Sequence, residues 1–166
     1  DLFAKHNSAI KSAEMTSMAL NTVGAGLGLV LFGGISTRIG RKGAFVLYHA
    51  MAFVMMLVLF MWLLPSNASQ TVLMLCLPVF GFFTVGMHAG YAVYFPELYP
   101  TRLRGTGTGF CFNMGRLGTA AAFFGFGAMA SPPSPEAKAM WLAPLFLVGV
   151  VVVLFAKETR DEALPE

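Results

Sequence analysis

Five long apolar segments constrain the fold of this chain more than any other feature of its 166 residues. We place them at about 15–36, 44–64, 71–95, 105–130 and 139–156. Each has the roughly 18 or more residues that a helix needs to cross the hydrocarbon core of a bilayer. A backbone in that core has no water to bind, so a spanning segment satisfies its polar groups within a helix. We therefore expect an all-α membrane protein with five transmembrane helices.

The composition excludes an ordinary soluble domain. Charged residues make up 11% of the chain and hydrophobic residues 57%, and the mean hydropathy is +0.70, whereas a soluble domain carries about 25% charged residues. The basic residues lie in short loops and not on an aromatic-rich face, so no nucleic-acid partner is expected. No cluster of His, Cys or carboxylate residues has the spacing of metal ligands, and no catalytic set occurs. We therefore expect no metal, no other cofactor and no enzymatic activity.

Lysine and arginine are distributed unequally between the two sides of the predicted bundle. One side holds seven of them, in the first loop, the third loop and the C-terminal tail, whereas the other holds only Lys5, Lys11 and Lys138. An excess of Lys and Arg marks the cytoplasmic side. The tail, 157–166, is therefore expected inside the cell, with 15–156 crossing the cell membrane. The first 14 residues would be an extracytoplasmic connection or a remnant of a preceding span.

One arginine lies inside an apolar segment. Arg116 is roughly 16 Å beyond Gly105, at ~1.5 Å per helical residue, which places it near the middle of a ~30 Å hydrocarbon core. A cation at that depth costs several kcal/mol unless it faces a cavity or a partner. We interpret Arg116 as a contact for an anionic solute group or for an acid on another helix; the alternative is a structural cation bound to backbone carbonyls. Asn113, one turn earlier on the same face, shares this interpretation.

Polar and small residues concentrate in the first, third and fourth segments, which are expected to line an interior. The second and fifth segments are almost purely apolar and suit lipid contact. In the third segment, Thr84, His88, Tyr91 and Phe95 form one stripe at helical spacing. The stripe predicts either a cavity wall in which His88 takes up a proton, or a packed interface, which is the preferred interpretation for His88. Asn21 in the first segment is a further candidate for solute contact.

Three motifs resemble those of the C-terminal half of a major facilitator superfamily transporter. Residues 33–42, Gly-Gly-Ile-Ser-Thr-Arg-Ile-Gly-Arg-Lys, resemble the loop signature between spans eight and nine, with Thr37 in place of the usual Asp. Glu97 to Arg104 matches the Glu-x6-Arg pattern after span ten of sugar-porter-like members. Residues 157–160, Lys-Glu-Thr-Arg, resemble the Pro-Glu-Thr-Lys/Arg element after span twelve, without its proline. The three motifs occur in order over nearly the whole chain.

The resemblance implies that the five helices form most of one six-helix lobe and that the N-terminal half of the transporter is missing. The chain is therefore expected to be a piece of a longer protein. It also implies ion pairs that close the inner ends of the helices and part when that face opens: Arg38 or Arg41 with Glu97, and Arg104 with Glu158. Alternatively, these charges only set topology, and Arg41 and Lys42 only meet anionic lipid. The candidate gating residues are Arg38, Gly40, Arg41, Glu97, Arg104 and Glu158.

The expected function is secondary active transport of a small organic solute, such as a sugar or a carboxylate, by alternating access. A coupled proton, the lipid bilayer and the missing half are the other expected partners. The alternative is a non-transporting polytopic membrane protein, either a transporter-derived sensor or a truncated fragment. The candidate substrate-binding residues are Arg116, Asn113, Tyr91, His88, Thr84 and Asn21.

Overall fold

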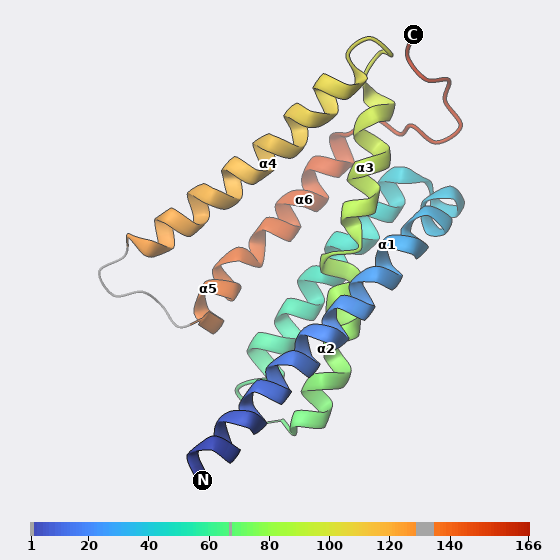
Figure 1. Ribbon diagram of the computed structural model, residues 1–166. Coiled ribbons are helices and arrows are strands. Elements are labelled where there is room, and N and C mark those ends of the chain that lie inside the picture. The colour runs from blue at the N-terminus through green and yellow to red at the C-terminus, as the bar shows by residue number, and fades with distance from the viewer. Residues whose placement is uncertain (1, 67, 129–134) are drawn as a thin grey trace.

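The computed structural model describes residues 2–66, 68–128 and 135–166, and this part of the chain contains helices and no strand. The expected all-α fold is confirmed. The helices are α1 (Leu2–Leu57), the π-helical turn η1 (Val58–Leu63), α2 (Gln70–Thr84), α3 (Met87–Leu98), α4 (Arg104–Gly127), α5 (Pro135–Leu142) and α6 (Pro144–Phe155) (Figure 1).

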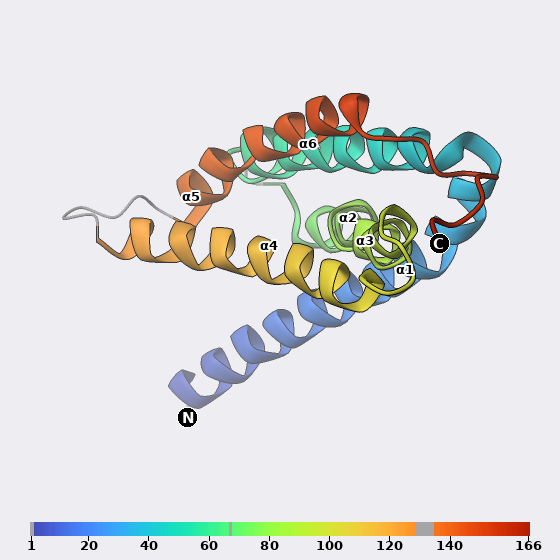
Figure 2. The same ribbon diagram turned by 90° about the horizontal axis from the view of Figure 1, so that it is seen from above.

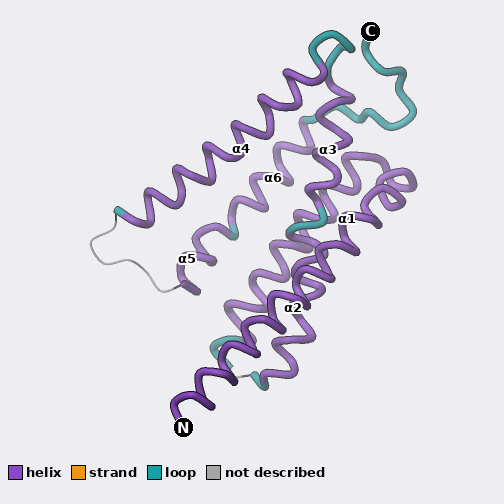
Figure 3. Tube along the Cα trace, viewed as in Figure 1, coloured by secondary structure: helices purple, strands orange, loops and turns teal. Residues whose placement is uncertain are grey.

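The longest helix, α1, consists of two arms that meet at Gly40. Gly40 has φ 86° and ψ 163°, a backbone conformation that is essentially restricted to glycine. The chain folds back at this point, and the two arms run in opposite directions (Figures 1 and 3). The bend falls within the glycine- and arginine-rich stretch 37–43 that separates the first two apolar segments.

The helices surround the α2–α3 segment unequally. The arms of α1 pack against α2, α3 and α6, whereas the main neighbour of α4 is α3. In the view from above, α6 lies beside the second arm of α1, and α4 runs along the opposite side (Figure 2). Much of α4 is exposed in consequence.

Glycines allow the first arm of α1 to approach α2 closely. A Cβ atom on Gly24 would collide with the Pro78 backbone, and one on Gly28 would meet the Phe82 carbonyl and the Gly86 Cα. Small residues at such crossings let helix backbones come together, which replaces the hydrophobic driving force that lipid does not supply.

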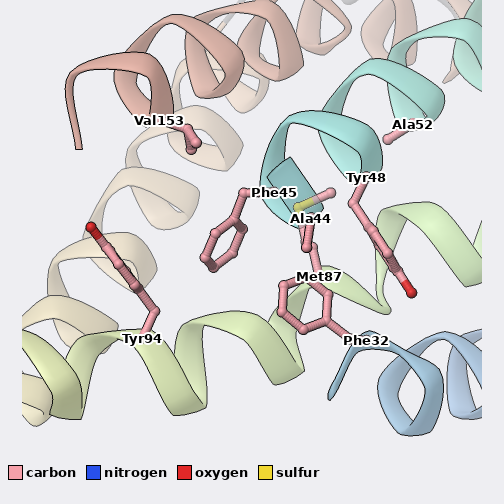
Figure 4. Packing of buried hydrophobic residues seen from close by; sticks show 8 residues of the cluster. All are labelled: Phe32, Ala44, Phe45, Tyr48, Ala52, Met87, Tyr94 and Val153. Carbon is pink, nitrogen blue, oxygen red and sulfur yellow. The ribbon is translucent and has the colours of Figure 1, made fainter. Parts of the chain in front are cut away.

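The core lies on the second arm of α1, where Ala44, Phe45, Tyr48 and Ala52 are all buried. Figure 4 shows these side chains between Phe32, Met87 and Tyr94 on one side and Val153 on the other. The expectation that the second apolar segment lies outside the packed bundle is therefore wrong for this face, whereas Leu47, Val54 and Met61 of the same segment are exposed. Its uniformly apolar sequence has no polar face to mark orientation, and aromatic side chains that suit lipid also suit a packed core.

Two predicted segments are each divided into two helices. The segment 71–95 corresponds to α2 and α3, which are separated at Val85 and Gly86, and the segment 139–156 corresponds to the end of α5 and to α6, with Ala143 between them. Pro144 begins α6, where its missing N–H costs nothing. The predicted end of the fourth segment, at 130, lies outside the described residues.

Within the described residues, two helical segments are long and apolar enough to cross a membrane, Ser12–Leu63 and Gln70–Leu98. The first contains both arms of α1. A shorter apolar helix occupies Met140–Phe155. The count of five spans stays a prediction.

Candidate functional site

An ion pair joins the bend of α1 to the end of α3. The Arg41 guanidinium donates through Nη2 to Glu97 Oε1 at 2.9 Å and through Nε to Glu97 Oε2 at 3.3 Å. Its Nη1 donates to Ser36 Oγ at 2.7 Å, and the Thr159 hydroxyl donates to the same Glu97 carboxylate. The Arg41 and Glu97 side chains are only 16% and 15% exposed, so this forked pair is shielded from water and stronger than a surface ion pair.

A second carboxylate, that of Glu158, binds the backbone where the second arm of α1 begins. Its Oε1 accepts the Arg41 N–H at 2.9 Å and its Oε2 accepts the Lys42 N–H at 3.1 Å. A carboxylate is favoured at a helix start, where unpaired N–H groups and the helix dipole attract negative charge. A Cβ on Gly40 would come within 2.7 Å of Oε2. Gly40 is therefore needed both for the bend and for the approach of Glu158.

The pKa of Glu158 is lowered from its ordinary value. Burial alone would raise it, but the N–H groups of Arg160, Arg41, Lys42 and Thr159 donate to the ionised carboxylate and outweigh burial. The charged form of Glu158 is thus the one that holds the tail against the bend.

Arg104 does not pair with Glu158, and this expectation is wrong. Arg104 donates to the carbonyls of Pro96 and Pro165 at 3.1 and 3.3 Å. Another arginine of the tail, Arg160, donates to the Arg38 carbonyl at 2.9 Å, near the end of the first arm of α1. Sequence spacing alone could not tell a carboxylate held by an arginine from one held by backbone N–H groups. We call residues 36–43, 97–104 and 157–166 the charged end.

A large cavity lies between α4 and the rest of the bundle. Its volume is about 820 Å³, and its lining is mainly apolar with few polar groups, the character of a small-molecule site. It is lined by His49 of α1, Met87 and Tyr91 of α3, Gly115, Gly118, Thr119, Ala122, Phe123 and Gly127 of α4, Leu142 of α5, and Leu145 and Phe146 of α6.

A smaller cavity of about 130 Å³ extends from the same place toward the charged end. Lys42 and Ala156 line it at that end, and His49 and Tyr91 line both cavities. The Tyr91 hydroxyl and His49 Nε2 are 3.0 Å apart, and His49 Nδ1 lies 2.8 Å from the Phe45 carbonyl. The His49–Tyr91 pair therefore stands where the two cavities meet.

Of the predicted solute contacts, only Tyr91 lines a cavity described above. Arg116 Nη1 donates to Asn113 Oδ1 at 3.4 Å, and both side chains are exposed on α4. His88 is exposed, with Nδ1 3.0 Å from the Val85 carbonyl, and the Thr84 hydroxyl donates to the Phe80 carbonyl.

The last predicted contact, Asn21, lies at the crossing of α1 and α2. A Cβ on Gly81 would come within 2.7 Å of its Oδ1, an atom that is buried without a hydrogen-bond partner in the described structure. The structure therefore does not bring the predicted contacts together around one site.

Sequence reasoning missed His49 and Thr159. His49 lies in a segment that we assigned to lipid, and the usable signal was that a histidine in an otherwise apolar span needs a partner. Thr159 belongs to the 157–160 motif, but only the charged side chains of that motif were expected to form contacts.

Long apolar helices, with a cavity among them and a charged cluster at one end, are the architecture expected of a multi-pass membrane protein. The family model described as "Sugar (and other) transporter" matches residues 7–166. The chain belongs to this family, and so to the major facilitator superfamily.

Curated relatives have names that agree with this assignment. A "Cis,cis-muconate transport protein" of Acinetobacter baylyi is 33% identical over 91% of this chain and 36% of its own length. The "Inner membrane metabolite transport protein YgcS" of Escherichia coli is 34% identical over 93% of this chain and 33% of its own. The "Sialic acid transporter NanX" of the same organism is 33% identical over 70% of this chain and 27% of its own length.

The chain spans about a third of the length of such relatives, 36% and 33% for the first two. No solved structure matched the chain.

Proposed function

We propose that this chain is most of the C-terminal lobe of a secondary active transporter that moves a small organic solute across the cell membrane by alternating access. Residues 15–156 form the membrane region, 1–14 precede it, and the tail 157–166 is cytoplasmic. The missing N-terminal half supplies the opposing lobe, and solute passes between the two.

The single observation that carries this proposal is the 820 Å³ cavity with the closed charged end beyond it. A transporter must hold its solute in a protected space and open one end at a time. Here the ion pair Arg41–Glu97, together with Glu158 on the N–H groups of Arg41 and Lys42, ties the bend of α1 to α3 and to the tail. These contacts are the latch of the cytoplasmic face, and they part when that face opens.

The solute is a sugar or a carboxylate, the classes to which the names of the relatives point. Arg116 and Asn113, exposed on α4, are proposed to face the opposing lobe and to contact an anionic group there. A guanidinium offers a fork of donors that suits a carboxylate. We also propose solute contacts for Asn21, Thr84 and His88. Thr84 and His88 bond only to carbonyls of their own segment, and Asn21 Oδ1 has no hydrogen-bond partner in the described residues.

Uptake by the full-length protein in proteoliposomes tests the proposal. The panel contains cis,cis-muconate, sialic acid and a neutral hexose, with protein-free vesicles as the control. We expect saturable uptake of at least one of these solutes. If Arg116 binds an anionic group, the two acids should be taken up in preference to the hexose.

A non-transporting membrane protein, such as a transporter-derived sensor or a truncated fragment, is the second candidate. It differs from the first candidate in that no solute crosses the membrane. A gene that encodes no further spans, or a full-length protein that binds solute without saturable uptake, would favour this candidate.

A further inference from the structure

His49 is a buried titratable group at the junction of the two cavities. Its side chain is 5% exposed, and it belongs to a segment whose sequence suggested only apolar contact. Gly149 of α6 makes room for the ring, because a Cβ at that position would collide with His49 Cδ2. The imidazole is therefore held in place by α6, while α3 and its own helix each supply one hydrogen-bond partner.

The two ring nitrogens have different partners, which define the neutral tautomer. The Phe45 carbonyl, 2.8 Å from Nδ1, can only accept a hydrogen bond. Nδ1 therefore carries the hydrogen, and Nε2 accepts the hydroxyl hydrogen of Tyr91 at 3.0 Å.

We propose that His49 and Tyr91 form a proton-binding site, in which His49 Nε2 takes a proton from the large cavity and Tyr91 reverses its hydrogen bond. That such binding drives solute movement rests on the function proposed above.

The reversal needs no movement of the backbone. When Nε2 gains a proton it becomes a donor, and the Tyr91 oxygen accepts from it. The Tyr91 hydrogen then turns to another acceptor, and Met87 Sδ lies 3.8 Å from the Tyr91 oxygen in the same cavity wall. A carboxylate solute in the cavity would be a stronger acceptor than the thioether. Proton binding thus creates both a cation and a donor that favour an anion beside them.

The charged groups near His49 are few. On its own helix, Lys42 lines the far part of the small cavity, where its Nζ donates to the Leu154 carbonyl at 2.9 Å. From α3, Tyr91 and Tyr94 line the same cavity, and the His88 ring lies 6.2 Å from that of Tyr91. The residues that α4, α5 and α6 contribute to the two linings carry no titratable side chain. Among the described lining residues, no carboxylate neutralises a charged His49 before solute enters.

The test is a pH titration of the full-length protein in nanodiscs, with ¹⁵N-labelled histidine observed by NMR. The His49 signal is assigned by its loss in H49Q, and H88Q identifies the signal of His88. Between pH 8 and pH 5 we expect the His49 Nε2 resonance to change from an acceptor to a protonated nitrogen. Y91F should shift the alkaline resonance toward that of an unbonded acceptor, because the donor is lost. Y94F is the matched control, since the Tyr94 hydroxyl donates to the Lys157 carbonyl and not to His49.

A second measurement uses uptake into proteoliposomes under an imposed pH gradient of one unit, which can drive up to about tenfold accumulation for one proton per solute. We expect H49Q to reduce accumulation to about onefold while solute exchange continues, and H6Q to behave as wild type. A His49 signal that stays unprotonated down to pH 5 would overturn the proposal, as would loss of accumulation in H88Q but not in H49Q. Failure of the proposed function is distinguishable: the wild type would take up no solute, while the titration needs none.

Discussion

At Glu97, one carboxylate receives three donor groups from two segments distant in sequence. The Nε and Nη2 groups of Arg41 and the hydroxyl of Thr159 all reach it. Because the Arg41 and Glu97 side chains are mostly shielded, loss of either charge would leave the other without compensation. A substitution of Glu97 therefore tests whether the contacts of the charged end hold the cytoplasmic face closed.

We expect Glu97→Gln in the full-length transporter to weaken the closed charged end. A hydrogen bond between charged groups contributes about 1.5–3 kcal/mol, and 1.4 kcal/mol corresponds to a factor of about ten in an equilibrium. Solute exchange rates should change by about tenfold with little loss of expression. The control is Glu162→Gln, since Glu162 pairs with Lys157 at a largely exposed position. If Glu97→Gln exchanges solute at the wild-type rate, the Arg41–Glu97 pair does not hold the cytoplasmic face closed.

Glu158 gives the charged end a dependence on acid. Its pKa is lower in the folded protein than the ordinary value of 4.5, so its stabilising effect is present above pH 4.5 and is lost as pH falls through the folded value. We expect the melting temperature of Glu158→Gln to lie below that of the wild type at pH 7, and the difference to shrink below pH 4.5. A difference that stays constant over this range would mean that Glu158 acts without its charge.

The charged residues of this site were predictable because loops rich in Arg and Glu stand out against an apolar sequence. The pairing of Arg41 with Glu97 was one of the expected pairs, whereas the partners of Glu158 were not expected. Whether Glu158 meets Arg104 or the N–H groups beside Gly40 depends on the path of the tail, which spacing does not specify. His49 was missed for the opposite reason, because nothing in its apolar neighbourhood distinguishes a core helix from a lipid-facing one.

At the scale of elements, the crossing of the first arm of α1 with α2 and α3 depends on facing glycines. Gly28 meets the Phe82 carbonyl and Gly86, at the point where α2 gives way to α3. The neighbouring Gly26 has nothing within 4 Å of where a Cβ would lie. Alanine at position 28 therefore tests the close packing of the two helices, whereas alanine at position 26 changes only the helix propensity.

We expect Gly28→Ala to destabilise the full-length protein by about 1–3 kcal/mol, the usual cost of forcing extra volume into a packed contact. Gly26→Ala, the matched control, should be neutral or slightly stabilising, because alanine favours the helix. Thermal unfolding in detergent measures both. Equal melting temperatures for the two variants would argue against this close crossing.

A separator was expected at 37–43 because glycine and charge interrupt an apolar pattern there, and the bend at Gly40 lies within it. The breaks at Val85–Gly86 and at Ala143 were not predicted. The first lies between Thr84 and His88 and the second directly precedes Pro144, but the residues on either side of each break are mainly apolar. Close packing of Gly86 on Gly28 and the proline at position 144 are local causes that a hydropathy pattern does not register.

At the scale of the whole molecule, the proposed orientation rests on the excess of Lys and Arg at the charged end. We expect a cysteine at Ser66, at the opposite end of the second arm of α1, to react with an impermeant thiol reagent added outside intact cells. A cysteine at Thr101, in the loop before α4, should react only after the cells are opened. The reverse pattern would invert the proposed topology.

Solute protection of a cysteine at Thr119 tests whether the 820 Å³ cavity belongs to the solute path. Thr119 lines the cavity from α4, whereas Val151 of α6, the control position, is 52% exposed and lines neither cavity. The native free cysteines Cys76 and Cys111 are first replaced by serine. We predict that a transported solute slows modification of Thr119→Cys by at least about threefold and leaves Val151→Cys unchanged. If a saturating concentration of a transported solute leaves the modification rate of Thr119→Cys unchanged, the cavity is not part of the solute path.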